Sequence, residues 1–194
     1  MREYHRRMRA DREMCMSRIL AVSGVKNSGK TTYIEQLLGY LGEKGIKTAV
    51  IKHDGHEFEA DVPGTDSWKY RQAGAYGCAV YSGSKFMAVR EWPRANPEAL
   101  MELFPDADLI LLEGFKYSGY PKIELVRSGV SREPVCPKDT VRAYVTDICE
   151  NLPWMEGEIP VYRFEQIQEV AQQLFKEMNH NKNNNEETGG NKTT

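Results

Sequence analysis

An eight-residue segment constrains this chain more than any other: Gly24-Val25-Lys26-Asn27-Ser28-Gly29-Lys30-Thr31 matches the pattern G-x-x-x-x-G-K-[ST] in full. An apolar run, Ile19 to Val22, precedes it, and a helical pattern begins at Lys30. In such a loop the backbone N–H groups turn inward around an anion at a helix N-terminus. The segment therefore predicts a strand, a phosphate-binding loop and a helix in succession, with a nucleotide as the ligand.

Each residue type in the loop has a chemical reason. Gly24 and Gly29 supply permissive backbone dihedrals. Lys30, a candidate catalytic residue, would place its ammonium between the β- and γ-phosphates, and the Thr31 hydroxyl is spaced to ligate a phosphate-bound Mg²⁺. Thr32 adds a contact to the α-phosphate. The predicted nucleotide-binding residues of the loop are Gly24, Lys26, Asn27, Ser28, Gly29, Lys30, Thr31 and Thr32.

Length, charge and cysteine content narrow the class of protein. A chain of 194 residues suits one α/β domain with a sizeable core. The formal charge of -2 argues against a partner that is nucleic acid or an anionic membrane, since both need a basic surplus. Small molecules or proteins are the expected partners. The four cysteines form no C-x-x-C pair, which favours reduced thiols in a cytoplasmic protein.

The two ends of the chain differ in composition from the rest. Residues 1–17 are rich in arginine without the continuous apolar region of a signal peptide, and we expect a flexible extension there. Residues 179–194 hold no apolar side chain, which predicts a disordered tail. The nucleotide-binding domain is expected over residues 18–178. No run is long and apolar enough to span a membrane.

Short β-rich runs alternate with helical patterns along this domain, which predicts an α/β fold. We expect a P-loop NTPase-like, mostly parallel sheet flanked by helices, with a β-hairpin insertion. The predicted strands are Ile19–Ser23, Lys47–Lys52, Cys78–Tyr81, Phe86–Trp92, Leu109–Leu112, Ile123–Val126, Val141–Thr146 and Val161–Tyr162. Of these, Cys78–Tyr81 and Phe86–Trp92 form the hairpin. The predicted helices are Lys30–Lys44, a short helix that Thr65 or Asp66 caps and that ends at Ala73, Pro97–Phe104, and Glu165–Met178.

A magnesium-nucleotide site also needs a carboxylate near the loop hydroxyl. Glu113 follows the apolar strand Leu109–Leu112, at the end where α/β sheets bind their ligands, and is a candidate metal-binding and catalytic residue. Asp54 follows another strand and is a second candidate metal ligand. Each of these carboxylates could instead cap a turn.

Two further patterns leave alternatives open. His53 and His56 form an H-x-x-H spacing, which suits contact with a ligand or loop packing better than zinc, since no further ligand is visible. No N-K-x-D segment with an obvious guanine-reading role is present. Asp147, after the strand Val141–Val145, could accept the two N–H donors of guanine, or it could cap a turn.

Three motifs in order carry a resemblance to a known family. They are the loop Gly24 to Thr32, then Lys52-His53-Asp54-Gly55-His56 with Asp61 and Gly64-Thr65-Asp66-Ser67, and then Leu111-Leu112-Glu113-Gly114-Phe115-Lys116 with Pro121-Lys122. Over residues 18–178 the chain closely resembles the MobB family of molybdopterin-guanine dinucleotide biosynthesis adapter proteins.

The resemblance implies a GTP-binding, weakly hydrolysing homodimer that assists the guanylyltransferase MobA when GMP is joined to molybdopterin. By that resemblance Thr31 with Asp54 or Glu113 holds Mg²⁺, and molybdopterin or its guanine dinucleotide is a further ligand. Related dimeric P-loop proteins insert a lysine into the opposite site. In those proteins the lysine directly follows the first glycine of the loop. Lys26 lies one position later, so its role is open.

Three other functions fit parts of the sequence. A metallochaperone GTPase of the hydrogenase or urease maturation type would share the loop and Glu113, but only the two histidines offer a metal-delivery segment. A small-molecule kinase would carry a lid rich in arginine, and Arg127, Arg132 and Arg142 do not cluster as a lid does. The third function is that of a non-catalytic adapter controlled by its bound nucleotide, and it overlaps with the function that the family resemblance implies. The absence of an obvious catalytic glutamine or arginine finger predicts slow hydrolysis.

Overall fold

The structure, a computed structural model, describes residues 18–56, 58–93 and 96–176 of the chain. The chain divides into two compact units. The core unit comprises Met1–His53 and Phe104–Thr194, and the insert unit comprises Asp54–Leu103. The extension and the tail expected at the two ends lie outside the described residues.

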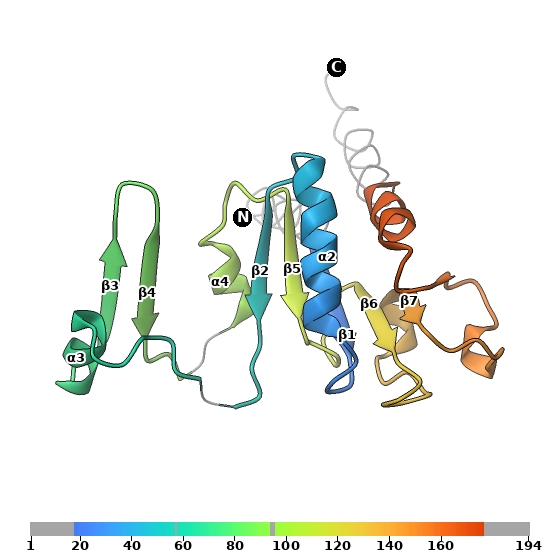
Figure 1. Ribbon diagram of the computed structural model, residues 1–194, viewed down its shortest axis with the longest axis horizontal. Helices are drawn as coiled ribbons and strands as arrows, with labels where there is room; N and C mark the ends of the chain where they lie inside the picture. Colours follow the sequence, from blue (N-terminus) through green and yellow to red (C-terminus); the bar gives the residue numbers. More distant parts are fainter. Residues whose placement is uncertain (1–17, 57, 94–95, 177–194) are drawn as a thin grey trace, which may run out of the picture. The chain divides into compact units, whose positions relative to one another are not determined.

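The core unit is built on a six-stranded sheet with the order β2-β5-β1-β6-β7-β8 (Figure 1). Every pair of neighbouring strands in it is parallel. The strands are β1 (Ile19–Gly24), β2 (Thr48–Lys52), β5 (Leu109–Glu113), β6 (Lys122–Val126), β7 (Val141–Thr146) and β8 (Val161–Tyr162). The predicted parallel α/β sheet is confirmed.

One face of this sheet is covered by helix α2 (Lys30–Glu43) and by a helical segment over residues 167–176. Leu37 and Leu41 of α2 are fully buried in a cluster that also includes Leu111 of β5 and Ala171 of the later segment. Figure 1 shows α2 lying along the strands. The apolar side chains of α2 recur at helical spacing because they face one side of the sheet.

A second apolar cluster lies at the β7 end of the sheet. It joins Val126, Val141, Tyr144 and Ile148, and Trp154 packs against it. Two single turns of 3₁₀ helix lie next to β7 along the chain: η1 (Lys138–Thr140) precedes it, and η2 (Pro153–Met155) follows it. This cluster fixes the chain that follows β7.

The parallel arrangement brings four strand ends to one edge of the sheet. Because neighbouring strands share a direction, Glu113 at the end of β5, Gly24 at the end of β1, Arg127 after β6 and Asp147 after β7 follow one another along that edge. Parallel α/β sheets bind their ligands there.

The insert unit holds an antiparallel hairpin of β3 (Gly77–Tyr81) and β4 (Phe86–Arg90), and the predicted hairpin is confirmed. Its turn is closed by the Ser82 N–H, which donates to the Lys85 carbonyl at 2.8 Å. Helix α3 (Asp66–Gln72) begins where predicted, with Thr65 as its N-cap.

Helix α4 (Pro97–Met101) ends before the predicted Phe104. The reason is Pro105, because a proline disfavours the helical conformation of the residue before it. Across the described ranges, none of the helices has both the length and the apolar character needed to cross a bilayer.

Candidate nucleotide-binding site

The loop between β1 and α2 has the backbone of a phosphate-binding loop. Gly24, Asn27 and Gly29 have φ angles of 141°, 65° and 89°. A Cβ added to Gly24 would lie 2.5 Å from the Leu125 carbonyl oxygen of the neighbouring strand β6. Only glycine fits that position, since both the dihedral and the close approach exclude a side chain.

Lys30 folds back over this loop. Its Nζ donates to the Val25 carbonyl at 2.8 Å. Burial lowers the pKa of Lys30, the negative charge of Glu113 opposes that shift, and the neighbouring cations Lys116 and Lys52 reinforce it. The loop is therefore surrounded by lysine ammonium groups, an environment that favours an anion.

A buried hydroxyl in the loop has no protein partner. Ser28 is fully buried, and its Oγ lacks a hydrogen-bond partner among the residues that the structure describes. A buried hydroxyl without a partner is costly, and an anion oxygen in the loop would satisfy it. Lys26, Asn27 and Thr32 are exposed, so the structure does not fix their roles.

Thr31 and Glu113 meet at the edge of the sheet, as the sequence predicts for the pair. The Thr31 hydroxyl donates to Glu113 Oε1 at 3.1 Å, and Lys52 Nζ lies 3.7 Å from the same oxygen. Hydroxyl and carboxylate oxygens are the hard donors that Mg²⁺ prefers. The donor set therefore fits a magnesium ion, although its binding by these two residues remains a prediction.

The other predicted metal ligand, Asp54, belongs to the insert unit. Its Oδ1 accepts a hydrogen bond from the His56 N–H at 3.4 Å. The His53 ring packs against Phe115, with 5.6 Å between ring centroids. The described part of the chain brings no three His, Cys, Asp or Glu side chains together as a metal site. The metal-binding role of Asp54 stays a prediction.

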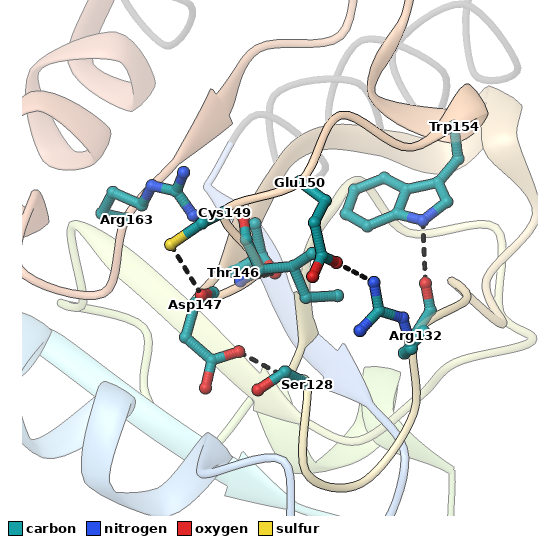
Figure 2. A network of polar contacts seen from close by, with 9 residues as sticks. Ser128, Arg132, Thr146, Asp147, Cys149, Glu150, Trp154 and Arg163 are labelled. Carbon is teal, nitrogen blue, oxygen red and sulfur yellow. Dashed lines mark hydrogen bonds and ion pairs between the residues drawn. The ribbon is translucent and has the colours of Figure 1, made fainter.

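Asp147 projects from the end of β7 into a polar network (Figure 2). It is exposed, and its Oδ1 accepts a hydrogen bond from the Ser128 N–H at 2.7 Å. Beyond it, Arg132 forms an ion pair with Glu150, and Trp154 Nε1 donates to the Arg132 carbonyl at 2.9 Å. The carboxylate is thus held in place with lone pairs still able to accept from a ligand.

Asp147 is two strands away from the phosphate-binding loop in the sheet order β1-β6-β7. Neighbouring strands are about 4.8 Å apart, which puts the end of β7 roughly 10 Å from the end of β1. That interval is comparable with the reach of a nucleotide from its phosphates across the ribose to the base. The position suits a residue that reads the base.

Sequence reasoning missed several side chains around this loop. Lys52 was seen only as part of a motif, yet it pairs with Glu113. Arg127 was considered only for a lid, yet its guanidinium lies beside Gly29. The sequence does show that Arg127 directly follows an apolar strand. Whether that strand lies next to the phosphate-binding loop depends on the strand order.

Lys122 supports the segment that follows Glu113. Its side chain is fully buried, and its Nζ donates to the Ser118 carbonyl at 2.6 Å and to the Lys116 carbonyl at 3.3 Å. Burial lowers the pKa of Lys122, and Cys136 and Glu124 act against that shift. The ammonium therefore ties the chain after β5 to the start of β6.

Replacing Lys122 with methionine is expected to lower the free energy of unfolding by about 1–3 kcal/mol, because both carbonyls lose their donor while the volume is nearly kept. Chemical denaturation of the two proteins measures the change. The matched control is Lys138→Met, at an exposed lysine of η1, which should unfold like the wild type. Equal unfolding midpoints for Lys122→Met and wild type would show that the ammonium does not hold this segment.

Comparison with known proteins finds a family whose matched span contains these residues. A family model described as molybdopterin guanine dinucleotide synthesis protein B matches residues 19–147. A molybdopterin-guanine dinucleotide biosynthesis adapter protein of Haemophilus influenzae is 32% identical over 138 residues, covering 70% of this chain and 75% of that protein. The Escherichia coli protein of the same description is 36% identical over 121 residues, covering 60% and 69%.

Among solved structures, Bacillus subtilis MobB superposes with a TM-score of 0.65 at 26% identity, covering 80% of this chain and 96% of that one. The matched residues 19–147 run from strand β1 to Asp147 and so include the whole edge described above. The resemblance inferred from the sequence motifs is confirmed: the chain belongs to the MobB family.

Proposed function

We propose that this protein is a GTP-binding adapter, with weak GTPase activity at most, that assists the attachment of GMP to molybdopterin in the cytoplasm. The observation that carries the proposal is the family match, because its span, residues 19–147, includes the phosphate-binding loop, Glu113 and Asp147. Two relatives with that match are described as molybdopterin-guanine dinucleotide biosynthesis adapter proteins.

In this proposal, Thr31 and Glu113 hold Mg²⁺. The hydrogen bond of 3.1 Å between the Thr31 hydroxyl and Glu113 supports the assignment, since the two oxygens lie close to each other. The bound ion would neutralise charge on the β- and γ-phosphates.

Hydrolysis in this proposal is an in-line attack of water on the γ-phosphorus. The loop N–H groups and the Lys30 ammonium stabilise the charge that develops on the phosphate oxygens. Glu113, close to Thr31, orients a water. The sequence shows no obvious glutamine or arginine finger that would position the attacking water or stabilise the transition state, so we expect slow hydrolysis. Slow hydrolysis suits a protein that acts mainly as a nucleotide-dependent switch.

The expected partners are MobA, molybdopterin or its guanine dinucleotide, and a second copy of this chain. They come from the family and from the description of the relatives as adapter proteins. A metallochaperone GTPase and a small-molecule kinase remain the alternatives. Titration of the purified chain with GTP and ATP in the presence of Mg²⁺ tests the proposal. Preference for ATP with phosphoryl transfer to a small acceptor would overturn it.

The assignment of Asp147 as the guanine-reading residue gives a specific prediction. Asp147→Asn is expected to weaken GTP binding about 10- to 100-fold, because the carboxylate that accepts the two N–H donors of guanine is lost. Xanthosine triphosphate should bind the variant better than the wild type, since the new amide can donate to the 2-oxo group. Binding of both nucleotides to both proteins is the measurement.

The asparagine keeps the Oδ1 acceptor for the Ser128 N–H, so the loop after β6 should be unchanged. Asp139→Asn, at an exposed residue of η1, is the matched control and should bind GTP like the wild type. If Asp147→Asn also binds GTP normally, Asp147 caps a turn and another residue reads the base.

A further inference from the structure

Arg127 has a position that the proposed function does not yet use. It follows the end of β6 and neighbours the phosphate-binding loop across the sheet. A Cβ added to Gly29 would lie 3.4 Å from Arg127 Nη2 and 3.5 Å from its Cζ. The guanidinium therefore lies beside Gly29, the residue of the loop that precedes Lys30.

The Phe164 ring packs against the guanidinium, and the Tyr33 ring supports Phe164. Arg127 Cζ lies 4.4 Å from the centroid of the Phe164 ring. Phe164 in turn meets Tyr33 of α2 edge to face, with 6.2 Å between the centroids and 80° between the planes. Tyr33 is buried in the first turns of α2, so the stack is anchored in the helix that follows the loop.

The chain after β6 is fixed as well. The N–H groups of Val130 and Ser131 both donate to the Arg127 carbonyl at 2.9 Å, and the Ser128 N–H donates to Asp147. The backbone that carries Arg127 is thus tied into a turn and to the end of β7. Such fixing orders the side chain before any ligand arrives.

The guanidinium itself has no polar partner in the described ranges. No hydrogen bond or ion pair joins it to another side chain or carbonyl there, and its buried Nε has no acceptor. Other arginines in this region have polar partners: Arg132 pairs with Glu150 (Figure 2), and Arg163 donates to the Ile148 carbonyl. A buried Nε without an acceptor is unfavourable, even with a ring on one face of the guanidinium.

We infer that Arg127 is a further nucleotide-binding residue, which donates to the α- and β-phosphates of the bound nucleotide. The N–H groups of a phosphate-binding loop cradle those two phosphates, and Arg127 lies against that loop at Gly29. A guanidinium also matches phosphate oxygens in charge and geometry. The inference rests on the proposed nucleotide binding but not on the identity of the base.

This role differs from that of an arginine finger. A contact to the α- and β-phosphates is made equally with GTP and with GDP, so it strengthens the binding of both. Arg127 therefore retains the product of hydrolysis as firmly as the substrate. That property suits a slow nucleotide-dependent switch.

The test compares full-length wild type with Arg127→Gln for binding of GTP, GDP and inorganic pyrophosphate, with pyrophosphate measured by displacement of labelled GDP. Arg127→Gln is expected to weaken all three about 10- to 100-fold, since each presents the phosphates that Arg127 contacts. The matched control is Arg142→Gln. Arg142 is exposed on β7 and, among the residues that the structure describes, donates only to the Asp139 carbonyl, so its variant should bind like the wild type.

Unchanged binding of GDP and pyrophosphate to a folded Arg127→Gln would overturn the inference and leave Arg127 as a structural partner of Phe164. A loss for GDP with none for pyrophosphate would also overturn it, because the contact would then be to the nucleoside. If Arg127→Gln does not fold, Arg127→Lys keeps the charge and serves for the same comparison. Should the wild type prefer ATP, the proposed function fails while ADP in place of GDP still tests Arg127.

Discussion

Lys30→Ala is expected to weaken GTP binding by about 100- to 1000-fold, since it removes a cation that makes several charge-assisted hydrogen bonds to the phosphates. Nζ now lies 2.8 Å from the Val25 carbonyl inside the loop. It has only a short way to move toward a phosphate in the same loop. Calorimetric titration of GTP in Mg²⁺ measures the effect.

Lys44→Ala is the control for this variant. Lys44 caps the other end of the same helix, where its ammonium lies 5.4 Å from the centroid of the Tyr40 ring. It should bind GTP as the wild type does, and thermal unfolding of both variants checks that the fold is kept. GTP binding by a folded Lys30→Ala at nearly wild-type strength would refute the assignment of the loop.

Gly24→Ala is expected to disrupt the loop and to lower the free energy of unfolding by about 2–4 kcal/mol, through backbone strain and a clash that must be relieved by shifting β6. The added Cβ would lie 2.5 Å from the Leu125 carbonyl oxygen and 2.7 Å from Ser28 Oγ. The φ of 141° adds a conformation that alanine rarely adopts. Denaturant unfolding and GTP titration measure the two consequences.

Helix α2 offers a matched glycine for comparison. Gly39 has no atom within 4 Å of an added Cβ, and it lies inside the helix. Gly39→Ala should therefore raise the free energy of unfolding by about 0.5–1 kcal/mol, because alanine is the better helix former. Equal effects of the two substitutions would mean that the close approach at Gly24 does not constrain the loop.

Local sequence patterns were sufficient to predict much of this fold. The apolar run Leu109–Leu112 became the buried strand β5, and the glycine and lysine pattern of the loop became a strand, turn and helix. Thr31 and Glu113 could be expected to meet because both follow strands of a parallel sheet, whose carboxyl ends share an edge. These inferences need only periodicity and strand direction.

Other features depend on which strands are neighbours. Arg127 reaches Gly29 because β6 pairs with β1, and no local pattern gives that pairing. Lys122 is a charged residue at the start of a strand, which in sequence suggests solvent exposure. It is buried because the segment after Glu113 passes over it and supplies two carbonyl acceptors. Strand order therefore decides both roles.

The proposed assistance of MobA through the bound nucleotide can be measured as the attachment of GMP to molybdopterin by purified MobA. The yield is measured with Mg²⁺ and GTP, first without this protein, then with the wild type, and then with Lys30→Ala. We expect the wild type to raise the yield above that of MobA alone and Lys30→Ala not to raise it. A yield that the wild type leaves unchanged, or that Lys30→Ala raises equally, would contradict the proposed assistance.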